Sequence, residues 1–167
     1  MNYLIRRRTK EDCKGIAHVV TISWNETYKK IVPDWFLEEL KNNEGERIKK
    51  SCNEFDENNN NQFVLEVDGK IAGFINFGAS KDEEYQDCGE IFALYIISKY
   101  KGNGFGRQLV EEAKKELKKM GYNKMIIGCL KGNPSNEFYK HIGGVYAKDG
   151  IYKRLQLKEN IYYYDKL

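Results

Sequence analysis

Several features of familiar protein classes are scarce in this 167-residue chain. It has only two prolines and fifteen glycines, which excludes a collagen-like or linker-like composition. No apolar run approaches the roughly 18 residues of a membrane helix, and the N-terminal segment has no hydrophobic signal core. Because 41% of the residues are hydrophobic, the composition is that of a folded chain. We expect a soluble cytoplasmic protein without a membrane partner.

Net charge and metal ligands are equally sparse. The 28 basic and 25 acidic side chains leave a formal charge of +3, which does not predict the concentrated basic face of a nucleic-acid-binding protein. The four cysteines include no CxxC pair, and the two histidines, His18 and His141, are far apart in sequence. We therefore expect no metal site, no disulfide framework and no nucleic-acid partner.

Strand and helix signals alternate along the chain and predict a single α/β (α+β) domain over residues 1–167. About seven strands are expected, at 3–8, 63–67, 71–77, 90–97, 124–130, 152–157 and 160–164. Helices are expected to start near residues 9, 34, 47, 105 and 135. Thr9 and Asp12 suggest a capping box at the first helix, and Asp68-Gly69 is a strong hairpin signal.

The most informative segment is the strand at 90–97 together with the glycine-rich residues after it. The strand sequence, EIFALYII, is almost continuously apolar, as expected for a strand covered on both faces. Gly102, Gly104 and Gly106 come next, and a helix begins there. Glycines let a ligand approach the backbone closely, and a helix N-terminus adds N–H donors and positive potential. Strand, glycines and helix together predict a cradle for a diphosphate.

The spacing of the glycines decides which diphosphate fits. The dinucleotide pattern GxGxxG fails because Arg107 stands where its third glycine belongs, and no acidic residue lies about 20 positions further on. The P-loop pattern GxxxxGK[ST] fails because the fifth residue after each glycine is not a glycine. What remains is [KRQ]xxGxG, with Lys101, Gly104 and Gly106 in its fixed positions.

Four segments of the chain resemble one known family. ALYIISKYKGNGFGRQLV (93–110) resembles the acetyl-CoA-binding motif of the GCN5-related N-acetyltransferase (GNAT) superfamily, usually [QR]xxGx[GA] after a strand. NPSNEFYKHIGG (133–144) resembles the family's later motif, and residues 5–40 and 160–167 are similar to bacterial members. Lys101 departs from the usual Gln or Arg. The resemblance implies the GNAT fold, with a mixed, mostly antiparallel seven-stranded sheet and about four helices.

The resemblance also implies an activity and a binding site. It implies an acyl-CoA-dependent N-acetyltransferase with acetyl-CoA as cosubstrate, a small-molecule or peptide amine as acceptor, and a homodimer. The implied cofactor-binding residues are Leu94, Tyr95, Ile96, Lys101, Gly102, Asn103, Gly104, Phe105, Gly106, Arg107, Asn133 and Tyr139. The alternative for the three strand residues is simple core packing.

Direct transfer of an acetyl group to an amine needs a base for the amine and an acid for the departing thiolate. Tyr139, in the family's Phe-Tyr position, is the predicted acid. Glu90 is the candidate base, because it alternates in phase with Leu94 and partial burial would raise its pKa. Trp24 and Tyr28, spaced i, i+4, are candidate walls of the acceptor pocket. The alternatives are packed aromatics and a solvated strand-end glutamate.

Other interpretations remain open from the sequence. Cys129 could form an acetyl-cysteine, although a buried thiol is the favoured interpretation, and His141 is expected to lie at the surface or to serve packing. The acidic residues between 82 and 87 could attract a cationic amine or form a solvated loop. Two other functions compete with the enzyme: a CoA-binding sensor or partner-binding module without turnover, and a nucleotide-binding protein, which the failed spacings disfavour.

Overall fold

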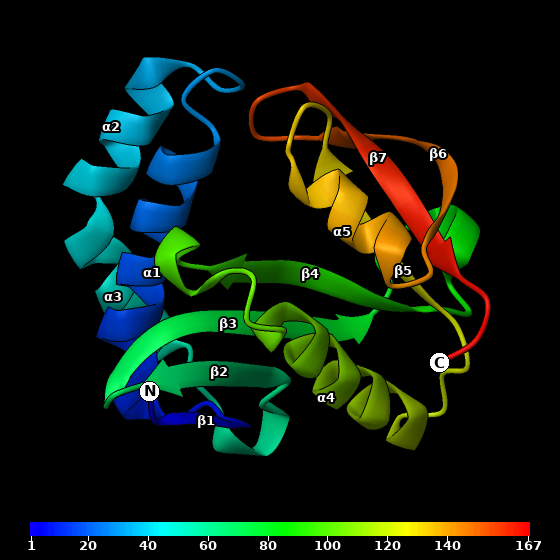
Figure 1. Ribbon diagram of the computed structural model, residues 1–167, viewed down its shortest axis with the longest axis horizontal. Helices are drawn as coiled ribbons and strands as arrows, with labels where there is room; N and C mark the ends of the chain where they lie inside the picture. Colours follow the sequence, from blue (N-terminus) through cyan, green and yellow to red (C-terminus); the bar gives the residue numbers. More distant parts are fainter. The chain divides into compact units, whose positions relative to one another are not determined.

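The computed structural model describes residues 1–167, which form a seven-stranded sheet and five α-helices. The strand order is β1-β2-β3-β4-β5-β7-β6 (Figure 1). Strands β4 and β5 run parallel, whereas β1 with β2, β2 with β3, β5 with β7 and β6 with β7 are antiparallel. The predicted mixed, mostly antiparallel sheet is therefore confirmed.

The chain forms two compact units. The first comprises Met1–Asn76 and Ala93–Glu112, and the second comprises Phe77–Phe92 and Ala113–Leu167. Three elements contribute residues to both units: β3 (Lys70–Ala79), β4 (Gly89–Ile96) and α4 (Phe105–Lys119).

In the first unit, three helices pack beside one another (Figure 1). They are α1 (Cys13–Thr27), α2 (Asp34–Asn42) and α3 (Glu44–Asn53). Ile16 and Val19 of α1 form a core cluster with Val64 and Phe74 of the sheet. The guanidinium of Arg47 on α3 donates to the carbonyl oxygens of Leu40 at 2.7 Å and Ala17 at 3.2 Å, so it ties all three helices together.

The strands, the capping box and the hairpin turn predicted for this unit are found in the structure. Strands β1 (Tyr3–Arg7) and β2 (Gln62–Val67) lie where they are expected. The backbone N–H of Thr9 donates to the Asp12 carboxylate at 2.8 Å, which is one half of the predicted capping box. Asp68 and Gly69 both have positive φ, as a two-residue hairpin turn requires.

In the second unit, the prediction of a strand at 152–157 is wrong. The unit contains β5 (Met125–Leu130), α5 (Ser135–His141), β6 (Val145–Tyr152) and β7 (Leu157–Tyr164), and residues 153–156 are the turn between β6 and β7. Gly150 lies inside β6, where glycine is uncommon. A Cβ there would meet Ile161 Cδ1 at 2.8 Å, so the glycine serves close packing between strands.

The β4–β5–β7 part of the second unit has two different faces. Tyr162 and Ile127 are paired across β5 and β7, and the Tyr162 hydroxyl donates to Asn136 of α5; we call this the α5 face. The residues that alternate with these along each strand point to the opposite face of the sheet. This opposite face carries the buried cluster Cys88, Ile126 and Ile161 and the two glutamates Glu90 and Glu159; we call it the carboxylate face.

The expectation that β4 is covered on both faces is wrong. Phe92 is 41% exposed, and Ala93, Leu94 and Tyr95 are only half-buried. The apolar residues 92–95 of β4 therefore leave part of their surface accessible.

Candidate active site

The glycine loop, residues 101–106, follows a 3-10 turn at Ser98–Tyr100 and includes the first two residues of α4. Gly102 and Gly104 have φ of +82° and +79°, a conformation that costs other residues roughly 1–2 kcal/mol. A Cβ at either position would have no atom of the protein within 4 Å, so the loop backbone is open on that side. The backbone therefore explains Gly102 and Gly104, whereas Gly106 lies in the first turn of α4 and has no positive φ.

The beginning of α4 presents unpaired backbone donors. Gln108 is the first residue whose N–H reaches a carbonyl four residues back, Gly104 O at 3.1 Å. The N–H groups of Phe105, Gly106 and Arg107 precede it and have no carbonyl in their own helix. Such N–H groups, with the helix dipole behind them, favour a bound anion.

Two contacts hold this loop in place. The Asn103 side chain donates to the carbonyl oxygens of Tyr100 at 3.0 Å and Lys101 at 3.3 Å. The buried Phe105 ring packs on Tyr3 of β1, with ring centroids 4.7 Å apart. The loop is therefore braced from inside and anchored at its helical end, while the side chains of Lys101 and Arg107 are exposed.

The preceding part of β4 is anchored by its side chains. The Tyr95 ring packs on Phe74 at 5.5 Å between centroids, and its hydroxyl accepts a hydrogen bond from Trp24 Nε1 at 3.1 Å. Ile96 is buried and Leu94 is half-buried. Because the Tyr95 side chain is used for packing, its backbone is the part that would contact a ligand.

The two aromatic residues predicted for the acceptor pocket lie in the helical core. Trp24 and Tyr28 are 5% and 7% exposed, and their ring centroids are 4.3 Å apart. Trp24 also packs on Phe36 of α2 at 5.3 Å. Their packing role is established, and their contact with an acceptor stays a prediction.

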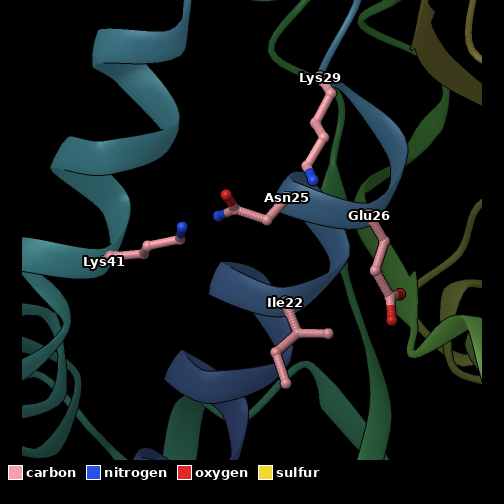
Figure 2. A pocket seen from close by; sticks show the side chains of 5 residues that line it. All are labelled: Ile22, Asn25, Glu26, Lys29 and Lys41. Carbon is pink, nitrogen blue, oxygen red and sulfur yellow. The ribbon is translucent and has the colours of Figure 1, made fainter.

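The opposite side of α1 borders a hollow of about 300 Å³ in the first unit. It is lined by Ile22, Asn25, Glu26, Lys29 and Lys41. Figure 2 shows the amino groups of Lys29 and Lys41 and the amide of Asn25 directed toward one space. Glu26 also accepts a hydrogen bond from the Ser98 N–H at 2.9 Å, so it caps the turn that leads into the glycine loop. No sequence motif points to this hollow.

In the second unit, Tyr139 is held on α5 by its neighbours. It is 6% exposed, and its ring packs on Phe138 at 5.4 Å and on Tyr162 at 6.2 Å. Its carbonyl oxygen accepts hydrogen bonds from the Tyr164 hydroxyl at 2.7 Å and the Gly144 N–H at 2.9 Å. The position of this tyrosine is therefore fixed by both its ring and its backbone.

An asparagine network joins α5 to the sheet. The Asn133 side-chain oxygen accepts from the Ser135 N–H at 2.8 Å, so Asn133 caps the start of α5. Asn136 donates to Leu130 O at 2.9 Å and accepts from the Tyr162 hydroxyl at 2.7 Å and from Asn160 at 3.0 Å. Asn136 cannot be found from the sequence, because its partners on β7 are more than 20 residues away in the chain.

Glu90 lies at the start of β4 on the carboxylate face. One carboxylate oxygen accepts the Lys81 N–H at 2.9 Å. Burial raises the pKa of Glu90, the Lys81 N–H opposes this, and the negative charge of Asp82 adds to it. A half-buried carboxylate with a raised pKa can take up a proton from a bound amine.

Glu90 and Tyr139 lie on opposite faces of the same part of the sheet. Glu90 pairs with Ile126 of β5 on the carboxylate face. Tyr139 packs on Tyr162, which pairs with the next residue of β5, Ile127, on the α5 face. The structure thus places three predicted residues in the second unit, Glu90, Asn133 and Tyr139, and the remaining ones in the first.

Cys129 has the properties of a buried thiol. It is 5% exposed, and burial, followed by the negative charge of Glu159, raises the pKa of Cys129 to about 12. A thiol with such a pKa is protonated at neutral pH and is a poor nucleophile. The favoured interpretation of the sequence agrees with this environment, and His141 is exposed, which is one of the two roles expected for it.

Ion pairs neutralise most of the acidic segment before Glu90. Lys148 contacts Asp82 and Glu84, each at 2.9 Å, and Lys124 contacts Asp87 at 3.3 Å. This segment therefore offers little net negative charge to a cationic acceptor. No three His, Cys, Asp or Glu side chains are grouped to hold a metal ion, and none of the helices has the length and hydropathy of a bilayer-spanning helix.

Comparison with known proteins agrees with this arrangement. The sequence model of the Acetyltransferase (GNAT) family matches residues 23–143. The uncharacterized N-acetyltransferase YuaI of Bacillus subtilis (strain 168) is 31% identical over 137 residues, which cover 81% of this chain and 76% of YuaI.

Solved structures show the same fold. The PaiA N-acetyltransferase of Thermoplasma acidophilum, solved in complex with coenzyme A, has a TM-score of 0.78 at 23% identity, over 98% of this chain and 100% of that one. An N-acetyltransferase of Staphylococcus aureus has a TM-score of 0.66 at 23% identity, over 99% of each chain. The family match, the relative and the shared fold lead to one conclusion: the chain belongs to the GNAT family of N-acetyltransferases.

Proposed function

We propose that this protein transfers the acetyl group of acetyl-CoA to a primary amine by direct attack in a ternary complex, with Tyr139 as general acid and Glu90 as general base. The observation that carries the proposal is the glycine loop, whose two left-handed glycines lead directly into the N-terminus of α4. Acetyl-CoA supplies an activated acyl group, and the residues of the chain bind it and move the protons.

The residues of the first unit fit a CoA diphosphate. The open side of the loop at Gly102 and Gly104 leaves room for a ligand against the backbone. The N–H groups that begin α4 supply donors, and the exposed Lys101 and Arg107 supply positive charge. Residues 94–96 would hold the pantetheine arm through their backbone groups, since the Tyr95 and Ile96 side chains are packed.

The second unit supplies the acid and the base. In a direct transfer the base must reach the attacking amine, whereas the acid must reach the departing sulfur on another side of the carbonyl carbon. Because Glu90 and Tyr139 lie on opposite faces of the sheet, each would reach the thioester from its own side. Glu90 would accept the proton of the amine nitrogen at its carboxylate, and the Tyr139 hydroxyl would protonate the thiolate.

A spectrophotometric assay of thiol release tests this function. Purified protein and acetyl-CoA are incubated with separate panels of polyamines, aminoglycosides, amino-acid-like metabolites and peptide N-termini, and the acetylated product is identified by mass spectrometry. The proposal expects amine-dependent thiol release and an N-acetyl product for at least one panel. CoA binding without product from any of these acceptors would instead support the sensor interpretation.

Three further expectations stay predictions: a cytoplasmic location, a homodimer, and one domain over residues 1–167. Contact with the acceptor at Trp24 and Tyr28 is likewise a prediction.

A further inference from the structure

Glu159 of β7 is a second carboxylate on the carboxylate face. Glu90 stands opposite Ile126 of β5, and Glu159 stands opposite Leu130 of the same strand. Ile126, Gly128 and Leu130 alternate onto one face of β5, so the two glutamates flank Gly128. Since glycine has no side chain, nothing from β5 separates the two glutamates at that position.

The Glu159 side chain occupies the space that Gly128 leaves. Its carboxyl carbon lies 3.0 Å, and its two oxygens 3.0 and 3.1 Å, from where a Cβ of residue 128 would be. On the other side, a Cβ at Gly150 of β6 would meet Glu159 Cγ at 3.1 Å. A glycine inside a strand weakens that strand and often marks a place where another group approaches the backbone closely. Here the two strands on either side of β7 each have a glycine beside Glu159.

The Glu159 carboxylate has no ionic or hydrogen-bonding partner, unlike those of Asp82, Glu84 and Asp87, which pair with lysines. Burial raises the pKa of Glu159, and the negative charge of Glu90 raises it further. Because the interaction between two charges is mutual, each carboxylate disfavours ionisation of the other. The other titratable or charged groups around the pair are Lys81, Asp82, Cys129, Lys148, Tyr152 and Arg154.

We propose that Glu159 is a positioning residue for acetyl transfer: it lies along Gly128 toward Glu90 and sets, through Glu90, the pH at which the acceptor amine can be deprotonated. The inference rests on the proposed role of Glu90 as base. When an ammonium acceptor binds, one N–H bond breaks and one O–H bond forms on a carboxylate oxygen of the pair. The pair then has one negative charge fewer, and the proton passes on to water.

Two substitutions test this pairing in different ways. E159Q removes the charge of Glu159 and keeps its shape. G128A keeps both carboxylates, but its new Cβ must displace the Glu159 carboxyl group, and the backbone there does not require a glycine φ. E46Q removes a carboxylate that is 78% exposed on α3 and serves as the control.

The measurement is a carbon-13 NMR titration of the glutamate carboxyl groups in the free protein, together with the pH profile of kcat/KM. We expect the Glu90 signal to titrate at lower pH in E159Q and G128A than in the wild type, and the acid limb of kcat/KM to move the same way. E46Q should leave both unchanged. A Glu90 titration that is identical in the wild type and E159Q would overturn the pairing.

The NMR titration needs no turnover, so it separates the two proposals. A coupled pair in a protein that acetylates no amine would leave the pairing intact and refute the proposed function. Normal turnover with a kcat/KM profile that E159Q does not shift would refute the role of Glu159 and leave the acetyl transfer intact.

Discussion

The glycine loop and the carboxylate face are built in opposite ways. The loop is made by consecutive residues, from the end of β4 through Gly104 to the start of α4, and its internal hydrogen bonds span at most a few residues. The carboxylate face depends on three strands, and only the pairing of β4, β5 and β7 sets Glu90 and Glu159 on either side of Gly128. A binding loop can thus be identified from a short motif, whereas an acid–base pair needs the sheet.

The largest expected effect falls on the α5 face. Y139F should lower kcat by roughly 10²- to 10⁴-fold, because the departing thiolate loses its proton donor. The phenylalanine ring can keep the packing against Phe138 and Tyr162, so thermal stability and the KM for acetyl-CoA should change little. Steady-state kinetics of Y139F measures these changes, and Y122F, which changes a tyrosine outside the proposed site, is the control. Unchanged kcat in Y139F would contradict the assignment.

The next effect belongs to the carboxylate face. E90Q should lower kcat/KM by about 10²-fold, since the amide can still accept the Lys81 N–H but cannot take a proton. In the wild type, the raised pKa of Glu90 means that activity falls as the pH drops through that pKa and the base becomes protonated. A pH profile of kcat/KM should therefore show an acid limb that E90Q lacks. An E90Q enzyme with the full wild-type limb would show that another group is the base.

A smaller effect is expected in the glycine loop. G104A imposes a side chain on a φ of +79° and should raise the KM for acetyl-CoA about tenfold, which corresponds to roughly 1–2 kcal/mol of strain. G69A is a matched control, because Gly69 in the β2–β3 hairpin also has a φ of +79° and no atom within 4 Å of its Cβ position. Equal KM values for the two variants would remove the loop from the cofactor site.

The smallest effect on activity concerns Cys129. C129A should destabilise the fold by about 1–2 kcal/mol through the lost packing of a buried side chain, with kcat within about twofold of the wild type. The reason is that the pKa of Cys129, about 12, keeps the thiol protonated at neutral pH. Thermal unfolding and steady-state rates measure both quantities. A loss of activity as large as that of Y139F would revive the acetyl-cysteine route.

The sequence predicts most of the fold because its local signals are strong. Asp68-Gly69, Thr9 with Asp12, and the helix after Gly104 are all where the pattern places them. The strand at 145–152 is not predicted, because a glycine inside it weakens the strand pattern. Ile161, the neighbour that explains Gly150, is on another strand.

The residues of the site likewise differ in whether local sequence identifies them. The glycine loop and the Phe-Tyr motif are short segments, and they carry the resemblance to the GNAT family. Glu159 and Asn136 could not be found in this way, because their roles depend on β5 and β7 pairing in one register. Phe92 is exposed although its strand is apolar, because hydrophobic character alone does not say which residues a partner covers.

Thermal denaturation with added ligands tests the central claim, that the glycine loop binds acetyl-CoA, most directly. Acetyl-CoA, CoA, ATP and NAD are compared at matched concentrations. A ligand that binds only the folded protein stabilises it by about 2.7 kcal/mol at 100 times its Kd. We predict a higher Tm with acetyl-CoA and CoA, a smaller rise in G104A, and none with ATP or NAD. An unchanged Tm with both CoA forms, or a rise with ATP or NAD alone, would contradict the claim.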